Sequence, residues 1–232
     1  PGNLNIASST INVEGDLSLG ALGLFNTTFN IDTLGTVSTG NTLNATALTM
    51  TGTTNIQGNS GTNTPAGILS VTATDTVDLL GTGTLAFTGL TINNAGTITH
   101  NMTGANVQMN SGTVLNNSGT YDFVSDVGIV TAGGGATINN TGSMVKSAGT
   151  SNTIGVVTNQ IGGDIDLLTG NLFFNAGGSF SGTVTVNDAA GSLNLSGGTF
   201  SVADATALQD LSTAPGNLNI ASSTINVEGD LS

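Results

Sequence analysis

A repeat of 23 residues runs through the middle of this chain. Apolar residues recur at that spacing six times, and the phrase Asn-Asn-x-Gly follows three of them. The six positions are Leu69, Ile92, Leu115, Ile138, Ile161 and Val184. A second apolar row at the same spacing consists of Ile98, Tyr121, Met144 and Leu167. A fixed period of 20–50 residues is the sequence signature of repeat architectures, in which neighbouring repeats stack to bury a continuous core.

Each repeat is built from short runs in which apolar and polar residues alternate. Leu4 and Ile6 alternate with asparagine, as do Ile11 and Val13, and this period of two is typical of half-buried strands. Apolar residues make up 37% of the chain, which is too many for a disordered segment, and 35 glycines provide turn material. We therefore predict an all-β parallel β-helix (β-solenoid) with about 23 residues per coil and nine to ten coils.

The repeated phrase predicts what lies at one corner of the coil. Stacked asparagine amides hydrogen-bond along the axis of such a helix, and asparagine tolerates the left-handed conformation of a sharp corner. Glycine supplies a positive φ where the corner is tightest. The expected turn ladders are Asn93, Asn116 and Asn139, or their neighbours Asn94, Asn117 and Asn140, together with Gly96, Gly119 and Gly142.

The chain also repeats on a longer scale. Residues 1–18 recur letter for letter as residues 215–232, an offset of 214 residues. We interpret 1–214 as one tandem-repeat unit and 215–232 as the start of the next identical unit, with further copies as head-to-tail partners along a fibre. An expression artefact or a circular permutation is the alternative. Residues 204–211 form the one helix-like stretch of the sequence.

Charge and cysteine usage exclude several classes of function. The net charge is −13 and Lys146 is the sole basic residue, so the chain lacks the cations that nucleic acids and anionic membrane surfaces require. There is no cysteine, which excludes disulfides and thiolate metal sites. No apolar run reaches the roughly 18 residues that a membrane-spanning helix needs, so we expect no membrane insertion in this segment.

Parallel β-helices also carry polysaccharide-cleaving enzymes, so the carboxylates need scrutiny. Glycoside hydrolysis uses two carboxylates that face each other, one with a raised pKa. Asp164 and Asp166 would share one face of a strand, but no His, Arg or Tyr cluster accompanies them, and His100 is solitary. We expect no enzyme activity, no catalytic residues and no cofactor. Asp164 and Asp166 are retained as weak Ca²⁺ candidates, because calcium takes carboxylate oxygens.

Several phrases resemble large bacterial surface β-helix proteins, namely filamentous-haemagglutinin-like adhesins and autotransporter passenger domains. They are the recurrent Asn-Asn-x-Gly-Thr, the stretch Leu-Asn-Leu-Ser-Gly-Gly-Thr-Phe at 193–200, and residues 81–89. The resemblance implies a right-handed helix, an extracellular or cell-surface location, and structural or adhesive work. The family brings no catalytic residues to transfer.

These features together favour a non-catalytic structural segment of a tandem-repeat extracellular fibre or cell-surface stalk. The alternative is an adhesin module that binds glycans or neighbouring cells through a Thr/Asn-rich face. A carbohydrate-active enzyme is the least favoured hypothesis.

Overall fold

A computed structural model describes most of the chain. The described residues are 3–7, 10–13, 17–25, 28–31, 41–51, 53–58, 62–71, 73–74, 76–81, 84–87, 89–181, 183–186, 191–203 and 217–228. For the strands up to residue 70 and for residues 80–81, 183–186 and 217, the description covers the backbone alone. The helix-like stretch 204–211 expected from the sequence lies outside the described residues.

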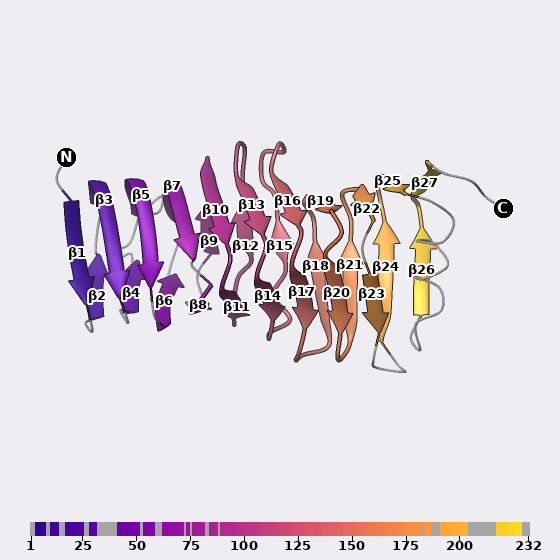
Figure 1. The fold of residues 1–232 in the computed structure, drawn as a ribbon, viewed down its shortest axis with the longest axis horizontal. Helices are drawn as coiled ribbons and strands as arrows, with labels where there is room; N and C mark the ends of the chain where they lie inside the picture. Colours follow the sequence, from indigo (N-terminus) through magenta and orange to yellow (C-terminus); the bar gives the residue numbers. More distant parts are fainter. Residues whose placement is uncertain are drawn as a thin grey trace.

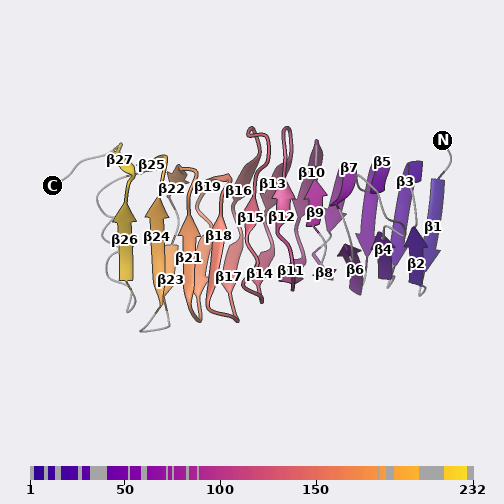
Figure 2. The same cartoon turned by 180° about the vertical axis from the view of Figure 1, so that it is seen from behind.

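The described chain is an all-β parallel β-solenoid, as predicted, and contains no helix among its described residues. Strands stack along the long axis, from β1 at one end to β26 and β27 at the other (Figures 1 and 2). The coil averages about 22 residues, and about six turns are described with their side chains; the coil count differs only slightly from the prediction. The hand of the helix stays a prediction. No helix of the described part is long and apolar enough to cross a membrane.

The strands form three faces, named here in the order in which the chain visits them. The first face contains β1 (Asn3–Ala7), β3 (Leu17–Phe25), β5 (Asn41–Thr51), β7 (Thr62–Val71), β10 (Leu90–Asn94), β13 (Val114–Asn117), β16 (Thr137–Asn140), β19 (Val157–Gln160), β22 (Gly178–Phe180), β25 (Thr199–Val202) and β27 (Thr224–Val227).

The other two faces complete each coil. The second face is a nine-stranded sheet of β2 (Thr10–Val13), β4 (Thr28–Ile31), β6 (Thr53–Gly58), β8 (Thr76–Gly81), β11 (Thr97–Met102), β14 (Thr120–Phe123), β17 (Ser143–Lys146), β20 (Asp164–Leu167) and β23 (Thr183–Val186). The third face contains β9 (Thr84–Phe87), β12 (Val107–Met109), β15 (Ile129–Val130), β18 (Ser151–Ile154), β21 (Asn171–Phe174), β24 (Ser192–Ser196) and β26 (Asn217–Ala221).

The first and third faces belong to one hydrogen-bonded sheet. The long strand β7 joins them, because its start pairs with β9 and its end pairs with β10. From β9 to β25 each described coil has three short strands separated by turns, and all pairings are parallel between successive coils.

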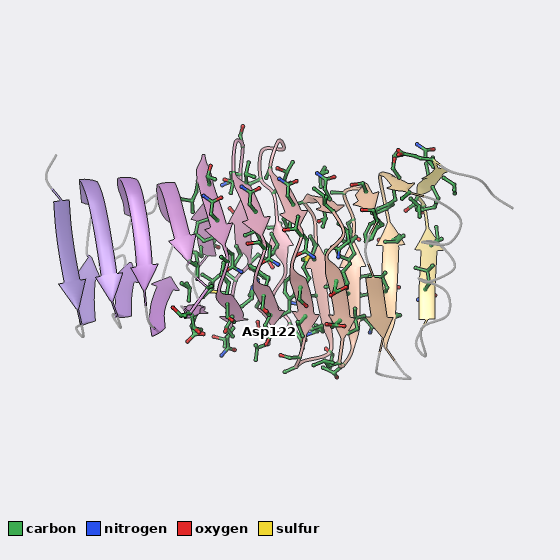
Figure 3. The ribbon with its side chains drawn as sticks, in the orientation of Figure 1. Asp122 is labelled. Atoms are coloured by element: carbon green, nitrogen blue, oxygen red, sulfur yellow. The ribbon has the colours of Figure 1, made fainter. Side chains whose placement is uncertain are left out.

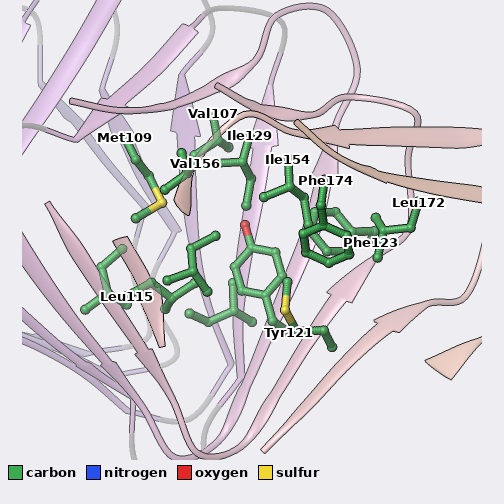
Figure 4. Close-up of a cluster of buried hydrophobic side chains, with 14 of the residues drawn as sticks. Val107, Met109, Leu115, Tyr121, Phe123, Ile129, Ile154, Val156, Leu172 and Phe174 are labelled. Atoms are coloured by element: carbon green, nitrogen blue, oxygen red, sulfur yellow. The ribbon is translucent and has the colours of Figure 1, made fainter. Parts of the chain in front are cut away.

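The core is the inside of the coil, where side chains from all three faces meet. Burial alternates along β13, β14, β16 and β17, with every second residue inward, as the period-two pattern predicts. In the cluster of Figure 4, Leu115, Tyr121 and Ile129 converge from the first, second and third faces respectively. Their apolar side chains stack coil upon coil, so burial continues along the axis rather than around one centre.

The first predicted apolar row is right over four positions and wrong at the last two. Leu69, Ile92, Leu115 and Ile138 pair successively on the first face. Ile138 then pairs with Thr158, because the next coil is shorter.

The shortening occurs at one corner. The turn before β16 spans 131–136, whereas the turn before β19 contains only Gly155 and Val156. Ile161 is consequently displaced to an outer corner position, where it is 51% exposed. Val184 is displaced to the second face, where it pairs with Ile165.

The second predicted row changes for the same reason. Ile98, Tyr121 and Met144 pair in register on the second face. Met144 then pairs with Ile165, and Leu167 pairs with Lys146 instead. Leu167 is buried in a neighbouring row, so its apolar character was read correctly but its partner was not.

Candidate functional site

Two ladders of side-chain amides run along the corner between the first and second faces. The inner ladder points into the coil and is buried. Asn94 Nδ2 donates to Asn117 Oδ1 at 2.6 Å, Asn117 Nδ2 to Asn140 Oδ1 at 2.6 Å, and Asn140 Nδ2 to Gln160 Oε1 at 2.8 Å. Each asparagine amide also donates to a backbone carbonyl of the next coil; Asn117, for example, donates to Ser143 O at 2.9 Å. The inner ladder thus fastens the corner of each coil to the next one.

The outer ladder is formed by the preceding residue of each strand and faces solvent. Asn116 Nδ2 donates to Asn93 Oδ1 at 3.0 Å, and Asn139 Nδ2 donates to Asn116 Oδ1 at 3.0 Å. Asn159 extends the ladder by donating to Asn139 Oδ1 at 3.1 Å. Both of the alternative turn ladders expected from the sequence are therefore present, one inside and one outside.

The two ladders donate in opposite directions along the axis. The inner amides donate toward the C-terminal coils and the outer amides toward the N-terminal coils. Among the described residues, the ends of the inner ladder, Asn94 Oδ1 and Gln160 Nε2, are buried without a hydrogen-bond partner. In the same column, Asn94 stacks on Val71 and Gln160 stacks on Phe180, neither of which has a polar side chain. The inner ladder therefore ends at the two coils in which Val71 and Phe180 take the place of an amide side chain in this column.

A groove of about 440 Å³ follows the outside of this corner, and we call it the amide groove. It is lined by Val71, Ala73, Asn93, Asn94, Ala95, Asn116, Asn117, Ser118, Asn139 and Thr141. The outer asparagines recur along it once per coil, which places equivalent amides about 4.8 Å apart. The groove carries no charged side chain, its exposed surface is mostly apolar, and the outer amides recur along it once per coil.

The corner glycines act through close approach and not through a positive φ. Gly96, Gly119 and Gly142 have no positive φ, so the sequence-based explanation was wrong. A Cβ on Gly119 would lie 2.1 Å from Gly96 O, and one on Gly142 would lie 2.2 Å from Gly119 O. These contacts are with backbone atoms, which have no room to move. Glycine is required here because consecutive corners stack backbone on backbone.

Positive φ occurs at other corner glycines, two of which lie between the third and first faces. Gly89 has φ +65° and Gly112 has φ +77°, one coil apart. This conformation is accessible to glycine at little cost and is unfavourable for residues with a Cβ.

The two calcium candidates lie on the outer side of β20. Asp164 is exposed and Asp166 is half-buried, while Ile165 between them points into the core. Ser143 Oγ donates to Asp166 Oδ2 at 3.4 Å. Within the described ranges no group of three or more His, Cys, Asp or Glu side chains is placed to hold a metal ion. Calcium binding by this pair stays a prediction.

The sole basic residue occupies a core position. Lys146 pairs with Phe123 in the preceding coil and with Leu167 in the next, and its side chain is fully buried. A charged side chain is rarely buried completely without a partner. The ammonium group of Lys146 therefore needs hydrogen-bond acceptors or a counter-ion within the protein.

The ammonium of Lys146 lies at the buried side of the corner between the second and third faces. Its Nζ donates to the carbonyl oxygens of Ser125, at 3.2 Å, and of Ala148. Asp126 Oδ1 lies 3.5 Å from Nζ, and this carboxylate is about half exposed. Burial lowers the pKa of Lys146, while Asp126 opposes that shift.

Asp126 holds the corner of the following coil. Ser151 N donates to its Oδ1 at 2.9 Å, and Thr150 donates through both its backbone N–H and its hydroxyl. The hydrogen bond from Ser151, those from Thr150 and the charge of Lys146 together lower the pKa of Asp126 to about 2. Asp122, labelled in Figure 3, belongs to β14. Its neighbours in sequence, Tyr121 and Phe123, point inward.

His100 is also in the core. Its Nδ1 lies 3.0 Å from the Tyr121 hydroxyl, and its ring contacts Phe123 with a centroid separation of 5.4 Å. Burial, with a smaller effect from the Lys146 charge, lowers the pKa of His100 to about 3, so the ring is neutral at pH 7. A fully buried imidazole among aromatic rings is a packing residue, and it has no access to substrate.

The 23-residue period contained the signal for this core row. His100, Phe123 and Lys146 are spaced by that period, and they pair successively in the structure. A lysine and a histidine are not expected in a core from composition alone, so the row was missed.

Comparison of the chain with protein-family models, curated proteins and solved structures found no match.

Proposed function

We propose that this chain is a structural segment of a tandem-repeat extracellular fibre or cell-surface stalk. One observation supports the proposal above all others. The identical sequence Asn-Leu-Asn-Ile-Ala forms β1 and β26, and the two copies pair through opposite edges. β1 pairs with β3 of the following coil, whereas β26 pairs with β24 of the preceding coil. A single copy inside an array can therefore pair on both sides.

The internal construction also suits mechanical work. Backbone ladders and apolar columns run along the axis from coil to coil, and both amide ladders reinforce them between β10 and β19. In solenoid proteins the free energy of unfolding is approximately the sum of the stabilities of the single repeats and of the interfaces between neighbouring repeats. A longer array therefore gains contacts without requiring a new core. A non-catalytic role agrees with this reading.

Electron microscopy of the array tests the proposal. We expect straight rods with an axial reflection near 4.8 Å from strand spacing. The strand pairings give nine and two-thirds coils per 214-residue unit. We therefore also expect an axial repeat of about 46 Å, which is the length of one unit. Globular particles, or rods without the 4.8 Å reflection, would contradict the fibre.

The amide groove supports a second candidate, an adhesin that binds glycans. Its lining offers amide donors and acceptors once per coil and no charged side chain. Because the net charge is −13, an acidic polysaccharide would be repelled, and the groove favours a neutral linear glycan.

Binding to immobilised cellulose, chitin and amylose distinguishes the two candidates. If the groove binds glycan, we expect saturable retention that Asn116→Ala weakens about tenfold or more. The matched control is Gln108→Ala, which removes an amide from β12 on the third face, outside the groove. Equal loss in both variants, or no retention of the unmodified chain, would leave the structural fibre as the function.

A further inference from the structure

The two copies of the repeated sequence occupy different faces of the coil. β1 lies on the first face and β2 on the second. In the second copy, β26 lies on the third face and β27 on the first. β1 and β26 lie at opposite ends of the stack (Figures 1 and 2), and their pairing partners identify the face of each.

The column that contains Ile6 makes the shift explicit. It passes up the first face through Ile6, Leu24, Met50, Val71, Asn94, Asn117, Asn140, Gln160, Phe180, Val202 and Val227. The copy of Ile6 is Ile220, but Ile220 pairs with Leu195 on the third face. The residue that completes the column is Val227, the copy of Val13.

The same pairings give the length of the unit in coils. The first face makes ten pairings between β1 and β27. β26 lies one of three faces before β27, so the 214-residue offset corresponds to nine and two-thirds coils. The unit therefore falls one face short of a whole number of coils.

We infer that successive units of the array are turned relative to one another by one face of the three-sided coil. The inference rests on the tandem array of the proposed function. Each new unit begins on the face before the one on which the preceding unit began, and the orientation returns after three units. This turn comes in addition to the ordinary coil-to-coil twist of stacked strands.

The outer edge of β26 is the edge to which the proposed array adds its next strand. Ile220 continues the column of Leu195, which is fully buried, yet Ile220 itself is 46% exposed. In the first copy, the equivalent edge of Ile6 pairs with Leu24. In the array, the strand that pairs with this edge is accordingly the third strand of the unit that β26 begins, in the register of β3 on β1.

The turn decides how the fibre presents its surface. The amide groove lies at the corner between the first and second faces in one unit. It lies between the third and first faces in the next unit, and between the second and third faces in the one after. A straight fibre built this way displays one groove on each of its three corners within three units, so it has no preferred side for contact.

Cysteine cross-linking tests the shift within the present chain, which has no natural cysteine. Ser201 pairs with Asn226 on the first face, and both side chains are at least partly exposed. We expect the double variant Ser201→Cys/Asn226→Cys to oxidise to a disulfide, since directly paired residues lie within disulfide reach. The comparison variant Ser201→Cys/Asn219→Cys would pair only if the second copy kept the face of the first. Cross-linking of 201 with 219, or of neither pair, would overturn the inference.

Imaging of three joined units tests the consequence. A single Asn116→Cys in each unit, labelled with gold, marks each groove. We expect successive labels to be rotated by about a third of a turn once the coil-to-coil twist, measured in the same particles, is subtracted. Rods in which successive labels are rotated only by the coil-to-coil twist would contradict the one-face turn between units and would still agree with the proposed fibre. Particles that are not rods would refute the fibre itself.

Discussion

Asn116 and Asn117 are neighbours in the chain, yet their amides donate hydrogen bonds in opposite directions along the axis. Asn117 donates to Asn140 in the next coil, and Asn116 donates to Asn93 in the preceding one. The inner amide is buried and the outer one is partly exposed. One dipeptide therefore ties its coil to both neighbours, and the two bonds differ in how much solvent competes for them.

Removing the inner amide should cost far more than removing the outer one. Asn117→Ala leaves Asn94 Nδ2, Asn140 Oδ1 and Ser143 O without their partner in a buried corner. We expect a loss of about 3 kcal/mol in unfolding free energy, because unsatisfied buried groups keep their desolvation cost. Asn116→Ala should cost less than about 1 kcal/mol, since water replaces its bonds. Urea denaturation followed by circular dichroism measures both, and equal midpoints would contradict the assignment.

The close stacking of corner glycines makes a second prediction. Gly119→Ala places a Cβ against the carbonyl oxygen of Gly96 and the backbone of Ala95. Those atoms belong to the adjacent coil, so we expect destabilisation of about 3 kcal/mol or more. Gly133→Ala is the control, because a Cβ there meets nothing within 4 Å and its φ is not positive. Thermal melting of the two variants should differ clearly; if Gly119→Ala melts with the parent protein, the corner is looser than described.

His100 predicts how stability changes in acid. Its pKa is about 3 in the folded chain and about 6.5 when unfolded, so the unfolded state binds more protons between these values. Stability should therefore fall as the pH drops from about 6.5 toward 3, by roughly 4 kcal/mol for this group. His100→Leu, which restores the residue type of Leu79 in the same row, should flatten that part of the profile.

Tyr121→Phe serves as the control for the histidine. It removes the hydroxyl beside His100 Nδ1 but retains the buried imidazole, so the slope between pH 6.5 and 3 should persist. An unchanged slope in His100→Leu would assign the acid sensitivity to the carboxylates instead.

The fold followed from the sequence because the repeat specified both the strand period and the stacking period. Asn93, Asn116 and Asn139 marked the same corner three times, and Ile92, Leu115 and Ile138 marked the same inward row. What the repeat did not specify was the length of each turn. Loop length changes free energy only slowly, so coils of different length stack equally well and the spacing drifts.

That drift explains why Ile161 and Val184 were misplaced although their spacing was perfect. The turn at 155–156 is shorter than the turn at 131–136, and every later residue moves along the coil. The groove and the amide polarity depend on which asparagine of each pair turns inward, and this choice appears only when the faces are assembled.

The shift between repeat copies was also inaccessible to periodicity alone. Residues 1–18 and 215–232 are identical in sequence, which suggests equivalent placement, but 214 residues do not make a whole number of coils. Only the strand pairings reveal that Ile220 lies on a different face from Ile6.

Lys146 and Asp126 give the last prediction, which concerns a buried charge and its exposed partner. Lys146→Met keeps the length of an apolar chain between Phe123 and Leu167 and removes an ammonium that burial disfavours. Replacing a buried ion by an apolar residue is often neutral or stabilising, and we expect a gain of about 1–2 kcal/mol. Asp126→Ala should instead destabilise by about 2 kcal/mol at pH 7, because Lys146 loses its counter-ion and Thr150 and Ser151 lose their acceptor. In the double variant the counter-ion part of that cost should disappear.

The pH dependence of the free energy of unfolding shows whether Asp126 stabilises the corner through its carboxylate charge or through packing alone. Its folded pKa of about 2 is below the unfolded value of about 3.9, so its stabilisation is complete above pH 4 and is lost as the pH falls toward 2. The parent chain and Asp126→Ala should therefore differ at pH 7 and converge near pH 2, as measured by urea midpoints. Asp164→Ala, which alters an exposed carboxylate on β20, should match the parent at both pH values. A constant gap between parent and Asp126→Ala down to pH 2 would mean that packing, and not the carboxylate charge, holds this corner.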